Sequence, residues 1–230
     1  MINHEFIIPK SKKKKSKGPE DPLELPRLMM IVGGTGQGKT TVAGNLLMAL
    51  NEKYDWDEAL YVTGNNKDEF LKSLEMPITT SPKDLDDFIT KVNQTSDEPK
   101  YNVLVLDDIQ GSPDFNIMLG RSNFAKFVLS HRHYGKVDGK GGTWVIALAQ
   151  TLKNSYTPTF RKMVSNWFTF YPRDEDEISS IEKVSGDKMK MKKAMALQRL
   201  EGKHAFLFIN KDDPSNIMYF MGFDRELNVN

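Results

Sequence analysis

The stretch from Gly33 to Thr40 places four glycines, a lysine and a threonine at a spacing suited to binding phosphate. It reads Gly-Gly-Thr-Gly-Gln-Gly-Lys-Thr and fits G-x-x-x-x-G-K-[ST] at every fixed position. A continuous apolar run precedes the stretch and a helical pattern follows it, which argues against a glycine-rich turn that matches by chance. In such a loop the backbone N–H groups and the helix N-terminus point at negative charge. We therefore expect a phosphate-binding loop.

The residue types assign separate tasks within this loop. Lys39 would reach the β- and γ-phosphates of ATP, and Thr40 would place its hydroxyl on Mg²⁺. The expected cofactors are accordingly ATP and Mg²⁺. The residues expected to line the nucleotide are Gly33, Gly34, Thr35, Gly36, Gln37, Gly38, Lys39, Thr40 and Thr41.

Three polar residues follow apolar runs farther along the chain. Asp107 and Asp108 come directly after 103–106, and Gln150 follows 144–149. Parallel strands bind ligands at their carboxyl ends, so Asp107 should meet the phosphate loop and help to hold Mg²⁺. Asp108 would activate a water for attack on the γ-phosphate, or else cap the following loop. Gln150 would sense the γ-phosphate or hold that water, or else be a strand-ending polar residue with no task.

Arg132 lies near the end of a helical pattern over 115–134. A helix that follows a strand in this architecture returns to the opposite edge of the sheet, away from the chain's own nucleotide. Any ATP that Arg132 contacts would therefore belong to a neighbouring copy, where an arginine stabilises transition-state charge. The alternative is a surface arginine at a helix C-terminus. His131 and His133 flank it, but residues two apart do not face each other on a helix, and no zinc site is expected.

Strand and helix patterns alternate between residues 28 and 171. Apolar runs typical of strands cover 28–32, 59–63, 101–106, 144–149 and 167–171. Helical patterns cover 41–50, 83–93, 115–134 and 158–165, and a Ser-Pro or Thr-Pro pair opens two of them. This alternation predicts an α/β fold with a mostly parallel central sheet and helices on both faces.

The C-terminal part has a different pattern, which predicts two helices and then a β-hairpin. The expected elements cover 174–184, 187–201, 204–210 and 217–223. So short a segment makes a poor independent domain, and the hairpin should extend the same sheet. We expect one ATPase domain over 27–230, with 172–230 as its C-terminal extension.

Charge is unevenly distributed along the chain. Residues 1–27 hold seven basic and four acidic residues, so the rest carries a net charge of −2 within a total of +1. The lysine-rich arm over 1–26 is expected to be disordered, and it would solubilise the protein, direct nuclear import or bind DNA. Any DNA contact by the remaining chain needs a local patch. The basic residues of 187–203 are one candidate, unless that face is only solvated, and Lys136 with Lys140 is another.

The composition excludes several classes of protein. The chain has no cysteine, which rules out disulfides and thiolate metal sites. Its apolar runs are far shorter than the roughly 18 residues of a membrane span, and no signal-peptide pattern opens it. These properties favour a soluble, intracellular protein.

Four motifs, taken in order, resemble those of the genome-packaging ATPases of large DNA viruses, the poxvirus type within the FtsK–HerA superfamily. The motifs are the loop 33–40; Val105-Leu106-Asp107-Asp108-Ile109; Arg132-His133-Tyr134-Gly135 ahead of a strand that ends Ala149-Gln150; and Phe160-Arg161 followed by Ser165-Asn166 and the aromatic strand 167–170. The resemblance spans roughly residues 27–172. Two positions depart from it. Asp108 stands where many members of the wider superfamily have glutamate, and 136–142 lengthens the link between the arginine and its strand.

The resemblance implies a RecA-like P-loop ATPase that forms a homo-oligomeric ring and translocates double-stranded DNA into a capsid. It makes Arg132 the first candidate for an arginine finger acting on a neighbour, and Arg161 the second. It also implies capsid portal or vertex proteins as partners, and a location in the virion or in the cytoplasm or nucleus of an infected host cell.

Two other functions stay open on the sequence. One is a small-molecule kinase with the same phosphate loop, although no arginine-rich lid is visible and the strand-ending Gln150 suits hydrolysis better. The other is an adaptor that binds ATP as a switch and tethers nucleic acid through the lysine-rich arm.

Overall fold

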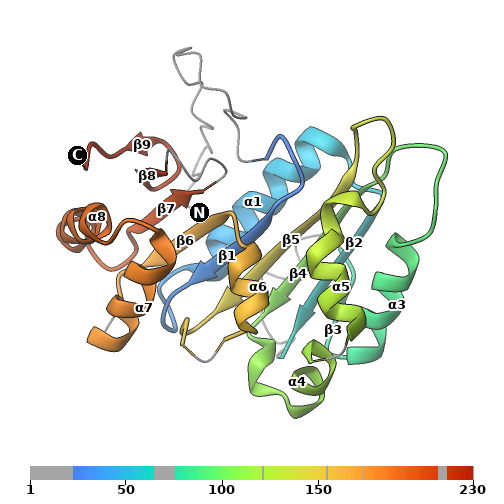
Figure 1. Cartoon of the computed structure of the whole chain (residues 1–230), viewed down its shortest axis with the longest axis horizontal. Helices are drawn as coiled ribbons and strands as arrows, with labels where there is room; N and C mark the ends of the chain where they lie inside the picture. Colours follow the sequence, from blue (N-terminus) through green and yellow to red (C-terminus); the bar gives the residue numbers. More distant parts are fainter. Residues whose placement is uncertain are drawn as a thin grey trace, which may run out of the picture.

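The described residues form a nine-stranded sheet with helices around it in the computed structural model (Figure 1). The structure describes residues 23–64, 76–120, 122–153, 155–172, 174–211 and 217–229. The strands are β1 (Leu28–Val32), β2 (Glu58–Thr63), β3 (Ile78–Thr79), β4 (Tyr101–Asp107), β5 (Gly142–Ala149), β6 (Asn166–Phe170), β7 (Phe206–Asn210), β8 (Met218–Met221) and β9 (Arg225–Glu226). The helices are α1 (Lys39–Tyr54), α3 (Pro82–Val92), α4 (Pro113–Leu119), α5 (Ser122–Ser130), α6 (Pro158–Met163), α7 (Glu175–Ser185) and α8 (Lys188–Glu201), with 3₁₀ turns η1 (Ile109–Gly111) and η2 (His131–His133).

The strand order explains where a ligand can bind. It is β3-β2-β4-β5-β1-β6-β7-β8-β9, parallel from β3 to β6 and antiparallel beyond. β1 lies between β5 and β6, so the loop after β1 opens in the middle of the carboxyl edge. Pairing of Val32 with Ala149, and of Asp107 with Leu148, brings the ends of β1, β5 and β4 level with one another. The predicted fold class is confirmed, and the C-terminal hairpin extends the same sheet.

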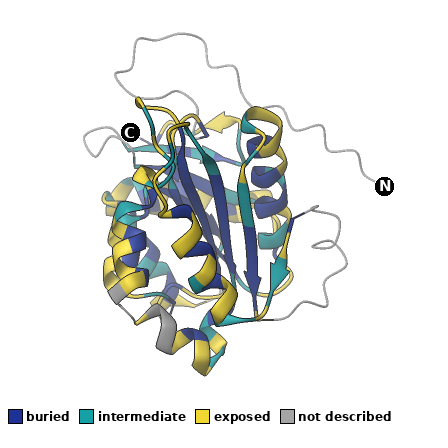
Figure 2. Ribbon diagram, turned by 90° about the vertical axis from the view of Figure 1, so that its right-hand side faces the viewer, coloured by how far each residue is buried: buried dark blue, intermediate teal, exposed yellow. Residues whose placement is uncertain are grey.

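Two hydrophobic cores lie on opposite faces of the sheet. Alternate residues of β1 supply both, with Met30 on the face covered by α3 to α8 and Met29 on the face covered by α1. Figure 1 shows α5 and α6 across one face and α1 on the other. In Figure 2 the central strands are buried, while the helices expose their outer surfaces. Burial on both faces is the reason that the central strands read as continuous apolar runs.

Side-chain caps fix the starts of several helices where the sequence indicated. The Thr157 side chain accepts a hydrogen bond from Phe160 N at 3.2 Å ahead of α6. Asp174 and Asp187 do the same for α7 and α8, the latter accepting from two backbone N–H groups. Each cap satisfies donors that have no partner within the helix. The two C-terminal helices therefore begin within one residue of their predicted starts.

The single helix predicted over 115–134 is wrong. The chain forms α4 and then α5, separated near Gly120, and ends in the 3₁₀ turn η2. Glycine is unfavourable within a helix, and α4 ends just before Gly120. Gly120 N still bonds back to Asn116 O and so closes the last turn of α4. Apolar residues resume at helical spacing in α5, which made two helices read as one. The short strands β3 and β9 were also missed, since two residues carry no periodic pattern.

Candidate nucleotide site at the carboxyl edge of the sheet

The loop between β1 and α1 lies at the centre of the carboxyl edge of the sheet and leads into an uncapped helix N-terminus. Gly33 N bonds to Ala149 O at 3.1 Å, which fixes the start of the loop on β5. Gly36 and Gly38 adopt φ of 71° and 113°, a left-handed conformation that glycine adopts without steric cost. No side chain caps α1, and its first turn contains no acidic residue. The N-terminus of α1 is thus left open to an anion.

The Gln37 side chain makes a structural contact that the sequence did not reveal. Its buried side chain accepts a hydrogen bond from Gly34 N and donates one to Tyr171 O at 3.0 Å. A Cβ at Gly33 would lie 2.9 Å from the Gln37 amide oxygen and 2.8 Å from Phe170. Gln37 therefore ties the phosphate loop to the end of β6, and Gly33 leaves room for that tie. The glutamine lies inside a variable position of the motif, so only the fold could expose this role.

Asp107 ends β4 and Asp108 follows it at the same edge, and the two are held differently. The Tyr61 hydroxyl donates to Asp107 Oδ2 at 2.8 Å. Asp108 is exposed, has a φ of 51° and accepts a hydrogen bond from Gln150 Nε2 at 2.5 Å. Its side chain makes no capping hydrogen bond to η1. The alternative that Asp108 caps the following loop therefore has no capping hydrogen bond to support it. The hydrogen bond between Asp108 and Gln150 instead joins the ends of β4 and β5.

Lys39 connects the loop to the acidic pair electrostatically. It is half-buried at the start of α1, and its Nζ lies 3.4 Å from Gly34 O. Burial lowers the pKa of Lys39, while the negative charges of Asp107 and Asp108 oppose that shift. Both carboxylates therefore act on the Lys39 ammonium. The phosphate loop and the β4 carboxylates, 68 positions apart from Lys39 to Asp107, converge on one place as predicted from the sequence.

Tyr156 and Arg161 support the loop that follows Gln150. The Tyr156 hydroxyl donates to Leu106 O at 3.0 Å, and burial raises its pKa well above the usual value, as do the charges of Asp107 and Asp108. Arg161 Nη1 donates to Leu152 O at 2.7 Å. The Arg161 guanidinium is thus engaged within its own chain, which gives it a structural task that needs no neighbour. Neither the Tyr61 nor the Tyr156 contact was foreseen; pairing β2 with β4 places Tyr61 two residues before Thr63, the partner of Asp107.

The oxygen donors at this edge fit Mg²⁺ bound together with a nucleotide. Among the described residues no group of three or more His, Asp or Glu gathers around a point, so a metal cage made by protein alone is absent there. Magnesium usually takes one or two protein oxygens and completes its octahedral shell with water and substrate phosphates. The Thr40 hydroxyl and the Asp107 carboxylate are hard donors of that kind.

Arg132 lies at the other edge of the sheet. A Cβ at Gly142, the first residue of β5, would lie 2.9 Å from Arg132 O, while Gln150 follows the last residue of that strand. Eight residues at about 3.3 Å each separate the two edges by about 25 Å. Arg132 is exposed, and no hydrogen bond or ion pair joins its guanidinium to another described residue. It cannot reach the phosphate loop of its own chain, as the topology predicted.

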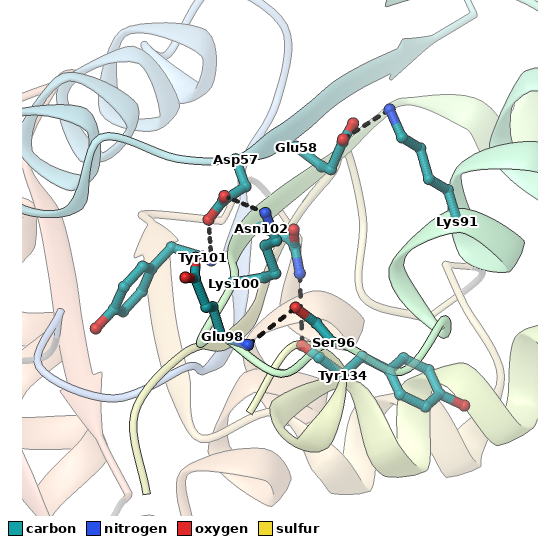
Figure 3. Close-up of polar contacts among 9 residues, drawn as sticks. All are labelled: Asp57, Glu58, Lys91, Ser96, Glu98, Lys100, Tyr101, Asn102 and Tyr134. Carbon is teal, nitrogen blue, oxygen red and sulfur yellow. Dashed lines mark hydrogen bonds and ion pairs between the residues drawn. The ribbon is translucent and has the colours of Figure 1, made fainter. Parts of the chain in front are cut away.

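A network of polar contacts closes this amino edge (Figure 3). Asp57 accepts hydrogen bonds from Tyr101 N at 2.8 Å and from Lys100 Nζ at 3.1 Å. Asn102 Nδ2 donates to Tyr134 O at 3.4 Å. Lys100 N also donates to Gly135 O at 2.7 Å. These contacts anchor the segment after Arg132 to the start of β4. The arginine therefore projects from a fixed backbone.

The residues beside Arg132 are structural. His131 is buried, and its Nδ1 lies 2.6 Å from Thr143 O, so Nδ1 carries the proton. Burial lowers the pKa of His131 to about 4 and keeps the ring neutral.

The 136–142 insert, expected as a glycine-rich loop, forms a tight hairpin in which Val137 and Lys140 exchange hydrogen bonds at 2.9 Å. Positive φ at Asp138 and Gly139 gives the turn type that suits such a hairpin.

Comparisons with known proteins bear on the fold. No protein-family model matches the chain, and no curated protein matches it. The genome packaging NTPase B204 of Sulfolobus turreted icosahedral virus 2, in complex with sulfate, matches with a TM-score of 0.56 at 15% identity over 84% of this chain and 95% of that one. Its complex with ATP-gammaS gives 0.56 at 13% identity, over 84% and 96%. The pCW3 conjugation coupling protein TcpA, monomer form with ATPgS, gives 0.59 at 13% identity, over 90% of this chain and 62% of that one.

The chain has the fold of these nucleotide-binding proteins. The likeness to viral packaging ATPases that the four motifs indicated is confirmed at the level of the fold. At such low identity the comparison establishes architecture alone, so activity has to be argued from the site. In the part of the chain that the structure describes, no helix is long and apolar enough to cross a membrane.

Proposed function

We propose that this protein is a Mg²⁺-dependent ATPase that translocates double-stranded DNA, and that it packages a viral genome into a capsid. One observation carries the proposal: the ends of three adjacent strands bring Lys39, the Asp107–Asp108 pair and Gln150 together. A glycine loop at an uncapped helix N-terminus, a half-buried lysine, and the carboxylates of half-buried Asp107 and exposed Asp108 are the parts that phosphoryl transfer to water requires. The fold shared with DNA-packaging and conjugation coupling proteins supports DNA as the partner.

Each residue of this edge has a chemical task in the proposed hydrolysis. The N–H groups of 33–40 and the Lys39 ammonium bind the phosphate oxygens and stabilise the charge that develops on them. Asp108 accepts a proton from the attacking water. The water oxygen forms a bond to the γ-phosphorus, and the bond between the γ-phosphorus and the oxygen of the ADP leaving group breaks. Gln150 orients the Asp108 carboxylate through their hydrogen bond. Mg²⁺, held by Thr40 and Asp107, would supply Lewis-acid charge on the phosphate oxygens when bound.

We further propose that neighbouring subunits of a homo-oligomeric ring share this site. Arg132 is exposed on an anchored backbone at the opposite edge of the sheet, where it suits a role on a neighbour's nucleotide. An arginine supplied in this way is worth about 10³–10⁵ in rate. Arg161 is the second candidate, although its contact with Leu152 O already explains its presence. Capsid portal or vertex proteins, and the virion or infected cell, belong to this same proposal.

The test is phosphate release by purified protein with Mg·ATP, with and without duplex DNA, compared with the Lys39→Ala variant. A DNA-translocating ATPase should release phosphate faster when DNA is present, and the variant should not. Lys83→Ala, which removes an exposed lysine on α3, is the matched control and should behave as wild type. Turnover that is indifferent to DNA would overturn the translocation proposal.

The same assay separates the two other functions. A small-molecule kinase would transfer the phosphoryl group to an added acceptor and release little free phosphate. An ATP-switched adaptor would bind ATP and DNA without turnover. Either result would contradict the hydrolytic role given to Asp108 and Gln150.

A further inference from the structure

A pocket of about 590 Å³ lies beside the phosphate loop, on the side away from the acidic pair. It is lined by residues of the turn between α8 and β7 and of the turn between β8 and β9. Its volume is within the range of small-molecule sites. Its lining residues include Glu201, Lys203, His204, Phe206 and Arg225.

Two residues that line the pocket approach the tip of the phosphate loop. The His204 ring Nδ1 lies 3.0 Å from Gln37 O. Lys203 Nζ lies 3.9 Å from the place that a Cβ would take at Gly36. His204 therefore contacts the loop that would bind the phosphates, and the Lys203 ammonium lies close to it.

The strand order gives a bound nucleotide its direction. The groups assigned to Mg²⁺ and the γ-phosphate, Asp107, Asp108 and Gln150, lie at the carboxyl ends of β4 and β5, on one side of β1. β6, β7 and β8 lie on the other side of β1, and the pocket is built at β7 and β8. A phosphate chain that crosses the β1 loop with its γ end toward β4 must send its nucleoside end toward β7.

The chemistry of the pocket suits a base and a ribose. Phe206 is half-buried, lines the pocket and packs on Phe170 with ring centroids 5.7 Å apart. It also contacts Phe168 and Phe223, and the part of its ring that lines the pocket is the aromatic surface for a base. Phe170 in turn lies under the loop, with its ring 3.5 Å from the place of a Cβ at Gly38. Glu201 Oε1 accepts a hydrogen bond from Arg225 Nη2 at 2.6 Å, and a carboxylate has further capacity to accept from ribose hydroxyls.

We infer that this pocket receives the base and ribose of the nucleotide whose phosphates lie on 33–40. This inference rests on the proposed function, because it assumes that the loop binds a nucleotide. It makes the C-terminal extension a part of the active site. It also gives Lys203, one of the basic residues considered for DNA, a place beside the phosphates instead.

The experiment compares binding of Mg·AMPPNP with binding of Mg·tripolyphosphate, which has no base or ribose. Stacking of a base on an aromatic ring is worth about 1–3 kcal/mol when the ring is removed entirely. Leucine keeps part of the apolar contact, so Phe206→Leu should weaken AMPPNP binding about fivefold to tenfold, near the lower end of that range. Glu201→Ala should weaken it by a smaller factor. Both variants should bind tripolyphosphate as the wild type does.

Arg199→Ala is the matched control, since Arg199 is exposed on the same helix and does not line the pocket. Urea unfolding midpoints close to that of the wild type would show that the variants are folded. Unchanged AMPPNP binding in both pocket variants, equal losses for the two ligands, or an equal loss in Arg199→Ala would each overturn the inference. Lys39→Ala separates the two ideas, because it should weaken both ligands. If it weakens neither, the proposed function fails; if it does and the pocket variants do not, only the inference fails.

Discussion

The carboxyl edge and the amino edge of the sheet carry similar polar residues and use them in different ways. We call the first the open end and the second the closed end. At the carboxyl edge, Asp108 is exposed and its side chain accepts a hydrogen bond from Gln150, and Lys39 lies in the field of two carboxylates. At the amino edge, Asp57 and Asn102 are tied to backbone groups of the same edge (Figure 3). Polar groups that satisfy one another hold the fold together, whereas groups left open can act on a ligand. Arg132 is the exception at the amino end, because its guanidinium projects from that closed network.

The largest effect should come from removing the lysine at the open end. Lys39→Ala takes away the charge that would stabilise the phosphates, and ATP hydrolysis should fall by at least about 100-fold, as for other transition-state donors. The measurement is steady-state phosphate release at saturating Mg·ATP. Turnover at the wild-type rate in the pure variant would show that this edge is not the site of hydrolysis.

A smaller effect is expected when the proposed base loses its charge. Asp108→Asn keeps the shape and the hydrogen-bonding capacity toward Gln150, so ATP should bind nearly normally while hydrolysis slows at least about tenfold, or about 1.4 kcal/mol in the barrier. Single-turnover hydrolysis together with equilibrium binding separates the two quantities. Loss of binding with turnover per bound site intact would instead make Asp108 a structural residue.

At the closed end the expected effect is on stability, not on rate. Burial lowers the pKa of His131 to about 4, so between about pH 6.5 and pH 4 the unfolded chain binds a proton that the folded chain does not. The free energy of unfolding should therefore fall as pH falls through that window, by about 3 kcal/mol from this residue. Urea unfolding at several pH values measures it.

The matched variants are His131→Gln and His133→Gln, since His133 is exposed on the same turn. The His131 variant should lose this part of the pH dependence, and the His133 variant should keep it. Identical pH profiles in all three proteins would contradict the assignment of a neutral, buried His131.

The smallest effect concerns the lysine-rich arm, whose residues 1–22 lie outside the part of the chain that the structure describes. Deletion of residues 10–17 should weaken binding to unrelated duplexes equally, without changing ATP hydrolysis in the absence of DNA. The slope of log K against log salt should flatten by roughly 0.9 for each DNA phosphate that the arm neutralises in the full-length protein. An unchanged slope would make the arm a targeting or solubility element.

The open end was more predictable from the sequence than the closed end. Each strand that leads to it is buried on both faces, so its apolar run is continuous and its polar end residue stands out, as with Asp107 and Gln150. The rule that parallel strands bind ligands at their carboxyl ends then brings those residues together. The tie from Gln37 to Tyr171 and the Tyr61 contact depend on which strands pair, and no local pattern encodes that.

At the closed end the sequence was misleading in its detail. Apolar residues keep helical spacing on both sides of Gly120, although helix α4 ends just before that glycine and a separate helix, α5, begins after it. The chain continues as a 3₁₀ turn, in which the His131 ring bonds to Thr143 O on β5; Gly135, two residues after the turn, has a φ of 86° and lies against Lys100. The position of Arg132 at that edge was nevertheless predictable, because it follows from the handed, returning connection between parallel strands.

The most direct measurement mixes two inactive variants. Arg132→Ala has a working phosphate loop and no finger, and Lys39→Ala has a working finger and no loop. Co-assembled from purified proteins, with mixed oligomers verified by mass, they should hydrolyse ATP well above the sum of the two alone, because some interfaces join a working loop to a working finger. No recovery in verified mixed oligomers, or full wild-type activity in a dilute monomer, would contradict a site shared between the two edges of the sheet.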